Sequence, residues 1–130
     1  MFKADLKILV VDDMAGMRLF ISKQLQSLGL TNIIQASDGK KAWETLNKDD
    51  SISVIFSDLN MPNMSGIELL REVRNSDKFK NLPFFIISAE SEKKTHEEAV
   101  AIGVTDYILK PFNEKTIQDK LSKIISLLEK

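Results

Sequence analysis

The chain has 130 residues, of which 43% are hydrophobic and 28% charged, with a net charge of −1, no cysteine and one histidine. The missing cysteines exclude disulfides and thiolate zinc sites, the even charge balance lacks the basic surface of a nucleic-acid binder, and no apolar run reaches the roughly 20 residues that span a bilayer. Because this length suits one domain with one sizeable core, we expect a single cytoplasmic domain over residues 1–130, without nucleic acid and without membrane insertion.

Short apolar runs alternate with amphipathic segments along the chain. The runs are rich in Ile, Val and Phe and too short for helices, which favours buried β-strands. The segments between them carry apolar residues at helical spacing. In chain order the pattern predicts strand 8–11, helix 14–28, strand 33–34, helix 40–48, strand 54–56, helix 66–74, strand 84–87, helix 92–102, strand 107–109 and helix 114–128.

The predicted helices have recognisable ends. Gly29 and Gly103 directly follow the apolar stripes of their helices, where a left-handed C-cap favours glycine. Asn113 can cap the last helix. The apolar face of the first helix is expected to comprise Met17, Phe20, Ile21, Leu25 and Leu28.

The five strand–helix pairs predict an α/β fold. Alternation of this kind gives right-handed crossovers and an open parallel sheet with helices on both faces, and the continuous apolar strands agree with burial on both faces. Five strands are too few for a closed barrel of eight. We therefore predict a doubly wound, flavodoxin-like (βα)5 domain with a five-stranded parallel sheet in the order 2-1-3-4-5.

Polar residues follow the strands at one edge of this predicted sheet. Asp12 and Asp13 follow the first strand, Asp58 the third, Ser88 the fourth and Lys110 the fifth. In open α/β sheets, ligands bind beyond the carboxyl ends of the strands at the switch point, which the first and third strands flank here. We therefore expect three carboxylates, a hydroxyl and an ammonium group at one site.

This set of groups favours phosphoryl transfer. Clustered carboxylates repel one another, and a lysine and a divalent cation relieve the repulsion. Oxygen ligands without histidine or cysteine select a hard ion such as Mg²⁺, and a cation with a lysine and a hydroxyl suits the charge of a phosphoryl group. We assign Asp58 as the nucleophile that forms an aspartyl-phosphate, because it stands alone at the end of the central strand.

Each of these residues has a structural alternative when it is taken alone. Asp13 is more often a helix N-cap than a metal ligand, and Asp58 is evenly balanced between a strand-end cap and a site residue. Lys110 before a proline is usually a solvated turn residue, and Ser88 a structural hydroxyl. Their coincidence at four strand ends is what favours a common site.

Together with their neighbours, these residues resemble a known family. The segments "LVVDD", "SDLNMPNMSG", "SAE" and "KPF" and the pair Met17–Arg18 are similar to the receiver domain of two-component response regulators, over essentially the whole chain. Among these, the chain looks most like the stand-alone chemotaxis regulators of the CheY type, for which the strand order predicted above is already known. The resemblance implies a signalling switch that catalyses only its own phosphorylation and dephosphorylation.

The resemblance also implies how the phosphoryl group is handled. Asp58 would accept it from a sensor histidine kinase of the CheA type, or from a small phosphodonor. Mg²⁺, with Mn²⁺ as a possible substitute, would be held by Asp13, Asp58 and the backbone carbonyl of Asn60, with Asp12 assisting through water. Asn60, Ala89 and Lys110 would bind the phosphoryl group, and the Lys110–Pro111 peptide bond would be cis.

Switching and output follow from the same resemblance. Ser88 would move towards the phosphoryl group and Tyr107 would rotate inward behind it, which would alter the face formed by the fourth helix, the fifth strand and the fifth helix. On that face lie Lys93, His96, Tyr107 and Lys120. In the chemotaxis regulators this face binds the flagellar motor switch protein, and a phosphatase can remove the signal. Asn60 and Glu90 would tune the rate of hydrolysis.

Four residues depart from the closest pattern in this family. Leu59 stands where tryptophan usually follows the phosphorylated aspartate, and the only tryptophan, Trp43, is expected to pack on the second helix. Ser88 keeps the hydroxyl of the more usual threonine without its methyl group. His96 replaces an apolar contact residue and is expected to be exposed, which weakens the assignment to the flagellar motor.

Two other classes of function compete with this interpretation. A phosphatase of the haloacid-dehalogenase type would need Asp-x-Asp after the first strand, and nucleotide binding would need G-x-x-x-x-G-K-[ST] or G-x-G-x-x-G; none of these is present. A receiver that acts as a phosphorelay intermediate, or that regulates a kinase or another enzyme, stays open. No DNA-binding domain follows residue 130, so we do not expect direct control of transcription.

Overall fold

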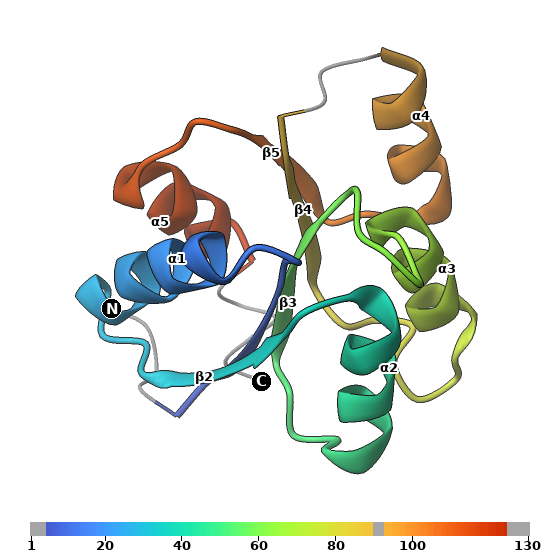
Figure 1. Ribbon diagram of the computed structural model, residues 1–130, viewed down its shortest axis with the longest axis horizontal. Coiled ribbons are helices and arrows are strands. Elements are labelled where there is room, and N and C mark those ends of the chain that lie inside the picture. The colour runs from blue at the N-terminus through green and yellow to red at the C-terminus, as the bar shows by residue number, and fades with distance from the viewer. Residues whose placement is uncertain (1–4, 90–92, 125–130) are drawn as a thin grey trace.

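A computed structural model describes residues 5–89 and 93–124 of the chain (Figure 1). Strands and helices alternate throughout. Their bounds are β1 Lys7–Val11, α1 Ala15–Ser27, β2 Asn32–Ala36, α2 Gly39–Lys48, β3 Val54–Asp58, α3 Gly66–Asn75, β4 Phe84–Ser88, α4 Lys93–Ile102, β5 Asp106–Leu109 and α5 Glu114–Ser122. The predicted elements are all present, with ends displaced by a few residues.

The five strands form one parallel sheet in the order β2-β1-β3-β4-β5. The predicted fold and strand order are therefore confirmed. Val11 pairs with Ser57 on the neighbouring strand, so the residues that follow β1 and those that end β3 lie beside one another. This register is what brings the polar strand ends to one place.

Helices cover both faces of the sheet, with α1 and α5 on one side and α2, α3 and α4 on the other (Figure 1). Successive residues of β1 point to opposite faces, so that Leu9 belongs to the core beneath α2–α4 and Val10 to the core beneath α1 and α5. Both residues are fully buried. Burial on both faces explains why the strands are continuously apolar. In the second core, the rings of Phe56 and Phe85 stack with their centroids 5.0 Å apart.

The helix ends match most of the predicted signals. Gly29 and Gly103 have φ angles of 87° and 111°, in the left-handed region that favours glycine. Asn113 caps α5 by accepting a hydrogen bond from the backbone N–H of Thr116 at 3.0 Å. The last helix was predicted to continue to residue 128; α5 ends at Ser122, and residues 125–128 lie outside the described part of the chain.

The prediction for the buried face of α1 was partly wrong. Ile21 and Leu25 are buried as expected, but the side chain of Phe20 is 45% exposed. Phe20 lies at the margin of the buried stripe, where it contacts the ring of Phe112 edge-on at 5.7 Å instead of entering the core. A residue at the edge of an amphipathic stripe can be covered or exposed according to its neighbouring element, which spacing alone does not specify.

Within residues 5–89 and 93–124, none of the helices is both long and apolar enough to cross a membrane.

Candidate functional site

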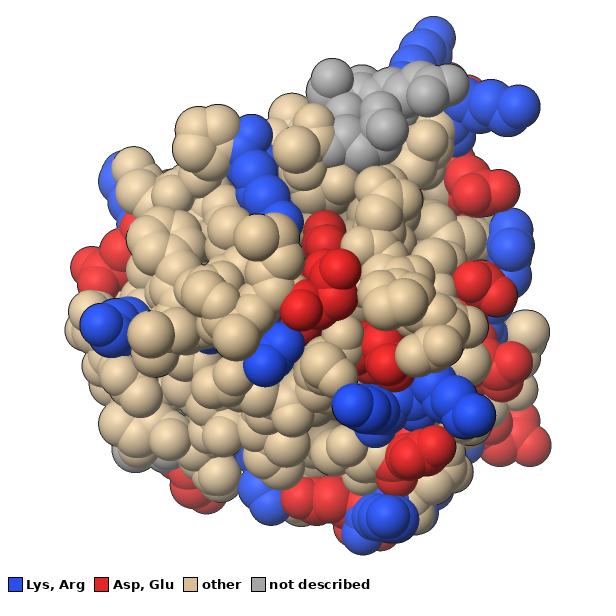
Figure 2. Space-filling view, viewed as in Figure 1, with Lys and Arg blue, Asp and Glu red and all other residues tan. Residues whose placement is uncertain are grey.

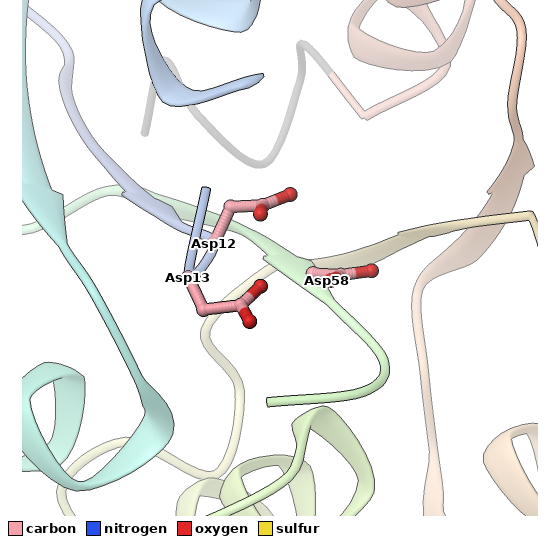
Figure 3. Close-up of side chains that lie close together, drawn as sticks. All are labelled: Asp12, Asp13 and Asp58. Carbon is pink, nitrogen blue, oxygen red and sulfur yellow. The ribbon is translucent and has the colours of Figure 1, made fainter. Parts of the chain in front are cut away.

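Three carboxylates meet where β1 and β3 end (Figure 3). Asp12 and Asp13 follow β1, and Asp58 is the last residue of β3. One carboxylate oxygen from each of them lies within 4.8 Å of the others. The parallel pairing of β1 with β3 fixes this convergence, since it aligns the carboxyl ends of the two strands.

Asp12 is the most buried member of this cluster, at 1% exposure. Its Oδ1 atom accepts a hydrogen bond from the backbone N–H of Met14 at 2.9 Å. Its Oδ2 atom is buried and accepts no hydrogen bond within the described part of the chain; the ammonium group of Lys110 lies 3.5 Å away. A buried carboxylate oxygen without a hydrogen bond is costly unless something else binds it.

Asp58 is half-buried, and its Oδ1 atom accepts a hydrogen bond from the backbone N–H of Leu59 at 2.8 Å. Burial and, after it, the nearby charge of Asp12 raise the pKa of the Asp58 carboxyl above its ordinary value. Lys110 acts in the opposite direction, with its Nζ atom 3.6 Å from Oδ1. The raised pKa shows that the fold holds this carboxylate in an electrostatically unfavourable place.

Lys110 reaches the carboxylates from the end of β5, next to the end of β4. The backbone N–H of Lys110 donates to the carbonyl of Ser88 at 2.9 Å, and Ser88 is buried. The Lys110–Pro111 peptide bond is cis, as predicted. The strand-end residues chosen from the sequence therefore do lie around one edge of the sheet.

The donor set of this cluster fits a hard divalent cation. The available ligand atoms are carboxylate oxygens from Asp12, Asp13 and Asp58, and one of them is buried without a hydrogen-bond partner. Mg²⁺ and Mn²⁺ prefer such oxygen ligands. Asp13 does not act as the N-cap of α1, because Met14 occupies that position and gives no side-chain cap.

The loop between β3 and α3 is tied to the beginning of α2. Asp38 caps α2 by accepting from the N–H of Lys41 at 2.8 Å, and its other oxygen accepts from the side-chain amide of Asn63 at 2.9 Å. The backbone N–H of Gly39 also donates to the carbonyl of Met64 at 3.1 Å. These contacts hold the segment that follows Asp58.

Several residues around the site were missed in the sequence. Arg18 donates from Nη1 to the backbone carbonyl of Asp12 at 2.7 Å, and Asp38 and Asn63 form the contact described above. The dipeptide Asp38–Gly39 at the start of a predicted helix was an available capping signal. The partners of Arg18 and Asn63 depend on loop conformation, for which the sequence offered no equivalent signal.

The structure also places the three departures from the family pattern other than Ser88, which is described above. Leu59 is 5% exposed and packs in the core beneath α2–α4, and Trp43 packs against the same core beside Phe79. His96 is exposed as expected, and its ring also stacks on Tyr107 at 4.8 Å. Tyr107 itself is 7% exposed.

The remaining described positions lie in the loops after β3 and β4 and on α4 and α5. Asn60 and Ala89 are exposed in the loops after β3 and β4. Lys93 is exposed on α4, and Lys120 on α5 forms an ion pair of 2.8 Å with Asp106. Glu90 lies outside the described residues.

The sequence and the structure of this chain are similar to those of known proteins. Residues 8–122 match the family model described as the response regulator receiver domain. Chemotaxis protein CheY-3 of Vibrio cholerae is 40% identical over 124 residues, which cover 95% of each chain. The structure is similar to that of CheY4 from Vibrio cholerae, with a TM-score of 0.83 and 34% identity over 92% of this chain and 98% of that one.

A second similar structure is the receiver domain of the sensor histidine kinase PA1611 from Pseudomonas aeruginosa, described with a magnesium ion coordinated in its active-site cleft. Its TM-score is 0.83 at 26% identity, over 93% of this chain and 98% of that one.

Proposed function

The chain belongs to the response regulator receiver family of two-component signalling and is CheY-like, and on that premise we propose that Asp58 is its phosphoryl acceptor. The observation that carries the proposal is the convergence of three carboxylates and Lys110 beyond the carboxyl ends of β1, β3 and β5. The chain then acts as a cytoplasmic signalling switch, and not as an enzyme with external substrates.

In the proposed reaction, a carboxylate oxygen of Asp58 attacks the phosphorus atom of a phosphohistidine or of a small acyl phosphate. The bond from phosphorus to the donor nitrogen or oxygen breaks, and the donor leaves with that electron pair. Burial deprives the attacking carboxylate of solvation, and Lys110 offsets negative charge beside it. The product is a mixed anhydride between Asp58 and phosphate.

Asp12, Asp13 and Asp58 would hold Mg²⁺, together with the backbone carbonyl of Asn60. When bound, the ion neutralises charge that builds up on the phosphoryl oxygens. The Oδ2 atom of Asp12, which is buried and accepts no hydrogen bond from the described residues, supports this role. Ser88, Ala89 and Asn60 would complete the phosphoryl pocket, and Asn60 and Glu90 would influence hydrolysis.

Phosphorylation can be tested directly. The intact protein, incubated with Mg²⁺ and acetyl phosphate, should gain one phosphoryl group by mass spectrometry. Asp58→Asn should gain none, whereas Asp77→Asn, which removes an exposed carboxylate elsewhere, should react like the parent. The assignment fails if Asp58→Asn gains a phosphoryl group to the same extent as the parent protein.

The metal assignment has its own test. Loss of a residue that only supports a metal ligand weakens metal binding by roughly ten-fold. Asp13→Ala should weaken Mg²⁺ binding by more than this, because Asp13 would be a ligand itself. Calorimetric titration measures this, with Asp77→Ala as the control. Unchanged affinity in Asp13→Ala would rule out its role as a ligand.

The output partner would bind the face formed by α4, β5 and α5. Phosphorylation adds negative charge and strong acceptors at Asp58, and Ser88 and Tyr107 would transmit the change to this face. A flagellar motor switch protein is the proposed partner, since the similar CheY proteins are chemotaxis proteins. Phosphorylation should then raise the affinity for the N-terminal peptide of a motor switch protein, and equal affinities would favour a phosphorelay role.

A further inference from the structure

A basic hollow lies beside the acidic cluster, between α1, the end of β2 and α2. Its volume is about 480 Å³, and its lining includes Arg18, Lys41 and Lys48. Figure 2 shows basic side chains next to acidic ones near the middle of this face and further basic side chains over α2. The proposed phosphorylation chemistry does not use this hollow.

Basic side chains outnumber acidic ones in the lining of the hollow. Among the residues that the structure describes, Arg18, Lys41 and Lys48 take part in none of the ion pairs. Glu44 is the one acidic side chain in the lining, against three basic ones. In a chain whose net charge is −1, this is a local excess of cations.

Hydrogen-bond donors also outnumber acceptors there. Arg18 is held in place by two hydrogen bonds, from Nε to the side-chain oxygen of Gln35 at 3.1 Å and from Nη1 to the carbonyl of Asp12 at 2.7 Å. Its remaining N–H groups can still donate to a ligand. The side-chain amide of Gln35 and the hydroxyl of Ser37 add further donors to the lining.

We propose that this hollow binds a polyanion that carries two or more phosphate groups and no nucleobase. Phosphate oxygens only accept hydrogen bonds, which complements a lining rich in donors. Lys41 and Lys48 are seven residues apart on α2, or about 10 Å along the helix, a span that a single phosphate does not bridge. Among the described residues, the lining contains no aromatic side chain on which a base could stack.

The acidic cluster opposes this binding, because Arg18 contacts the backbone of Asp12 and the ligand would approach like charge. Salt screens this repulsion and the attraction to the cations alike, since the Debye length falls from about 30 Å at 0.01 M to about 8 Å at physiological ionic strength. Attraction to three nearby cations should prevail at low salt and fade as salt is added.

The test is a titration of the intact protein with tripolyphosphate, in metal-free buffer at low salt, followed by amide chemical shifts. The parent should show saturable changes at residues of α1, β2 and α2. The double variant Lys41→Gln/Lys48→Gln should bind at least about ten-fold more weakly. The matched control Lys94→Gln/Lys115→Gln, which removes two exposed charges elsewhere, should change affinity less than two-fold.

If both double variants lost the same affinity for tripolyphosphate, the binding would reflect general attraction to positive charge. That result would overturn the proposal. Hexaglutamate serves as a second probe, and binding as tight as that of tripolyphosphate would show a surface for acidic peptides instead. The result does not depend on Asp58 chemistry, so phosphorylation by acetyl phosphate can be checked separately in the same variants.

Discussion

Asp58 combines a buried position with three charged neighbours. Burial and Asp12 raise its pKa, so the folded protein keeps this proton at pH values where the unfolded chain has already lost it. Ionised Asp58 therefore lowers the free energy of unfolding, and this loss diminishes as the pH falls towards the ordinary value of 3.8. Without a bound cation, the ionised carboxyl of Asp58 therefore destabilises the folded protein at neutral pH.

Asp58→Asn should consequently be more stable than the parent at pH 7 without metal. The gain should shrink as the pH is lowered towards 4, where the parent carboxyl takes up its proton. Urea denaturation at several pH values measures this, with Asp77→Asn as an exposed control that should show no gain. An unchanged or lower stability of Asp58→Asn at pH 7 would contradict the electrostatic account.

Asp49 shows the opposite effect on the far side of the domain. A hydrogen bond from Lys7 at 2.8 Å, helped by Ser51, lowers its pKa to about 2. The stabilisation from this pair should be complete above pH 3.8 and should disappear as the pH falls through about 2. In Lys7→Met, the Asp49 carboxyl should titrate closer to 3.8 by NMR, whereas Lys78→Met should leave its titration unchanged.

Among the elements, the end of α3 is joined to its neighbours by one arginine. Arg74 donates to the carbonyls of Gly103 and Leu82, each at 2.7 Å, and lies 3.5 Å from the hydroxyl of Thr105. Burial lowers the pKa of its guanidinium group, and no carboxylate pairs with it within the described residues. Backbone carbonyls at the end of α4 and before β4 therefore accept hydrogen bonds from the guanidinium group of Arg74 in place of water.

Arg74→Met should lower the free energy of unfolding by about 2–4 kcal/mol, because the removed donors leave partly buried carbonyls without partners. Arg71 is the matched control, since its pair with Glu98 is exposed at 3.3 Å. Arg71→Met should cost no more than about 1 kcal/mol. Chemical denaturation of both variants compares them, and equal losses would show that the buried hydrogen bonds of Arg74 contribute little.

The elements also show what the sequence could predict. Strand positions follow from periodicity, and the meeting of Asp12, Asp13, Asp58 and Lys110 follows from the geometry of parallel sheets. The strand order was taken from the known doubly wound fold that this alternation favours. Phe20 was misplaced because helical spacing does not say which edge of a stripe is covered. The contacts of Arg18 with Asp12 and of Asn63 with Asp38 arise from loop conformation, which local sequence patterns do not determine.

On the scale of the whole molecule, one sheet separates two hydrophobic cores. Leu25, a residue of α1, is buried in the core between α1, α5 and the sheet. Trp43 packs against the core on the other side of the sheet. Each strand supplies side chains to both cores. The two halves should therefore unfold together, as small domains usually do.

Leu25→Ala should destabilise the protein by about 2–5 kcal/mol, the usual result of emptying a buried leucine site. The fluorescence of Trp43 should report the same shifted midpoint as far-UV circular dichroism, although Trp43 lies across the sheet from the change. A fluorescence midpoint that stays at the parent value would show that the two cores unfold independently.

Gly66 begins α3 and donates its backbone N–H to the carbonyl of Leu59 at 2.8 Å. A Cβ atom added there would collide with the backbone carbonyl of Asp58, although the backbone of Gly66 is not in the left-handed region. Every other amino acid would therefore push on Asp58, the proposed phosphoryl acceptor. A library of all substitutions should find position 66 as intolerant as position 58 when selected for signalling, although Gly66 itself has no side chain with which to take part in any reaction.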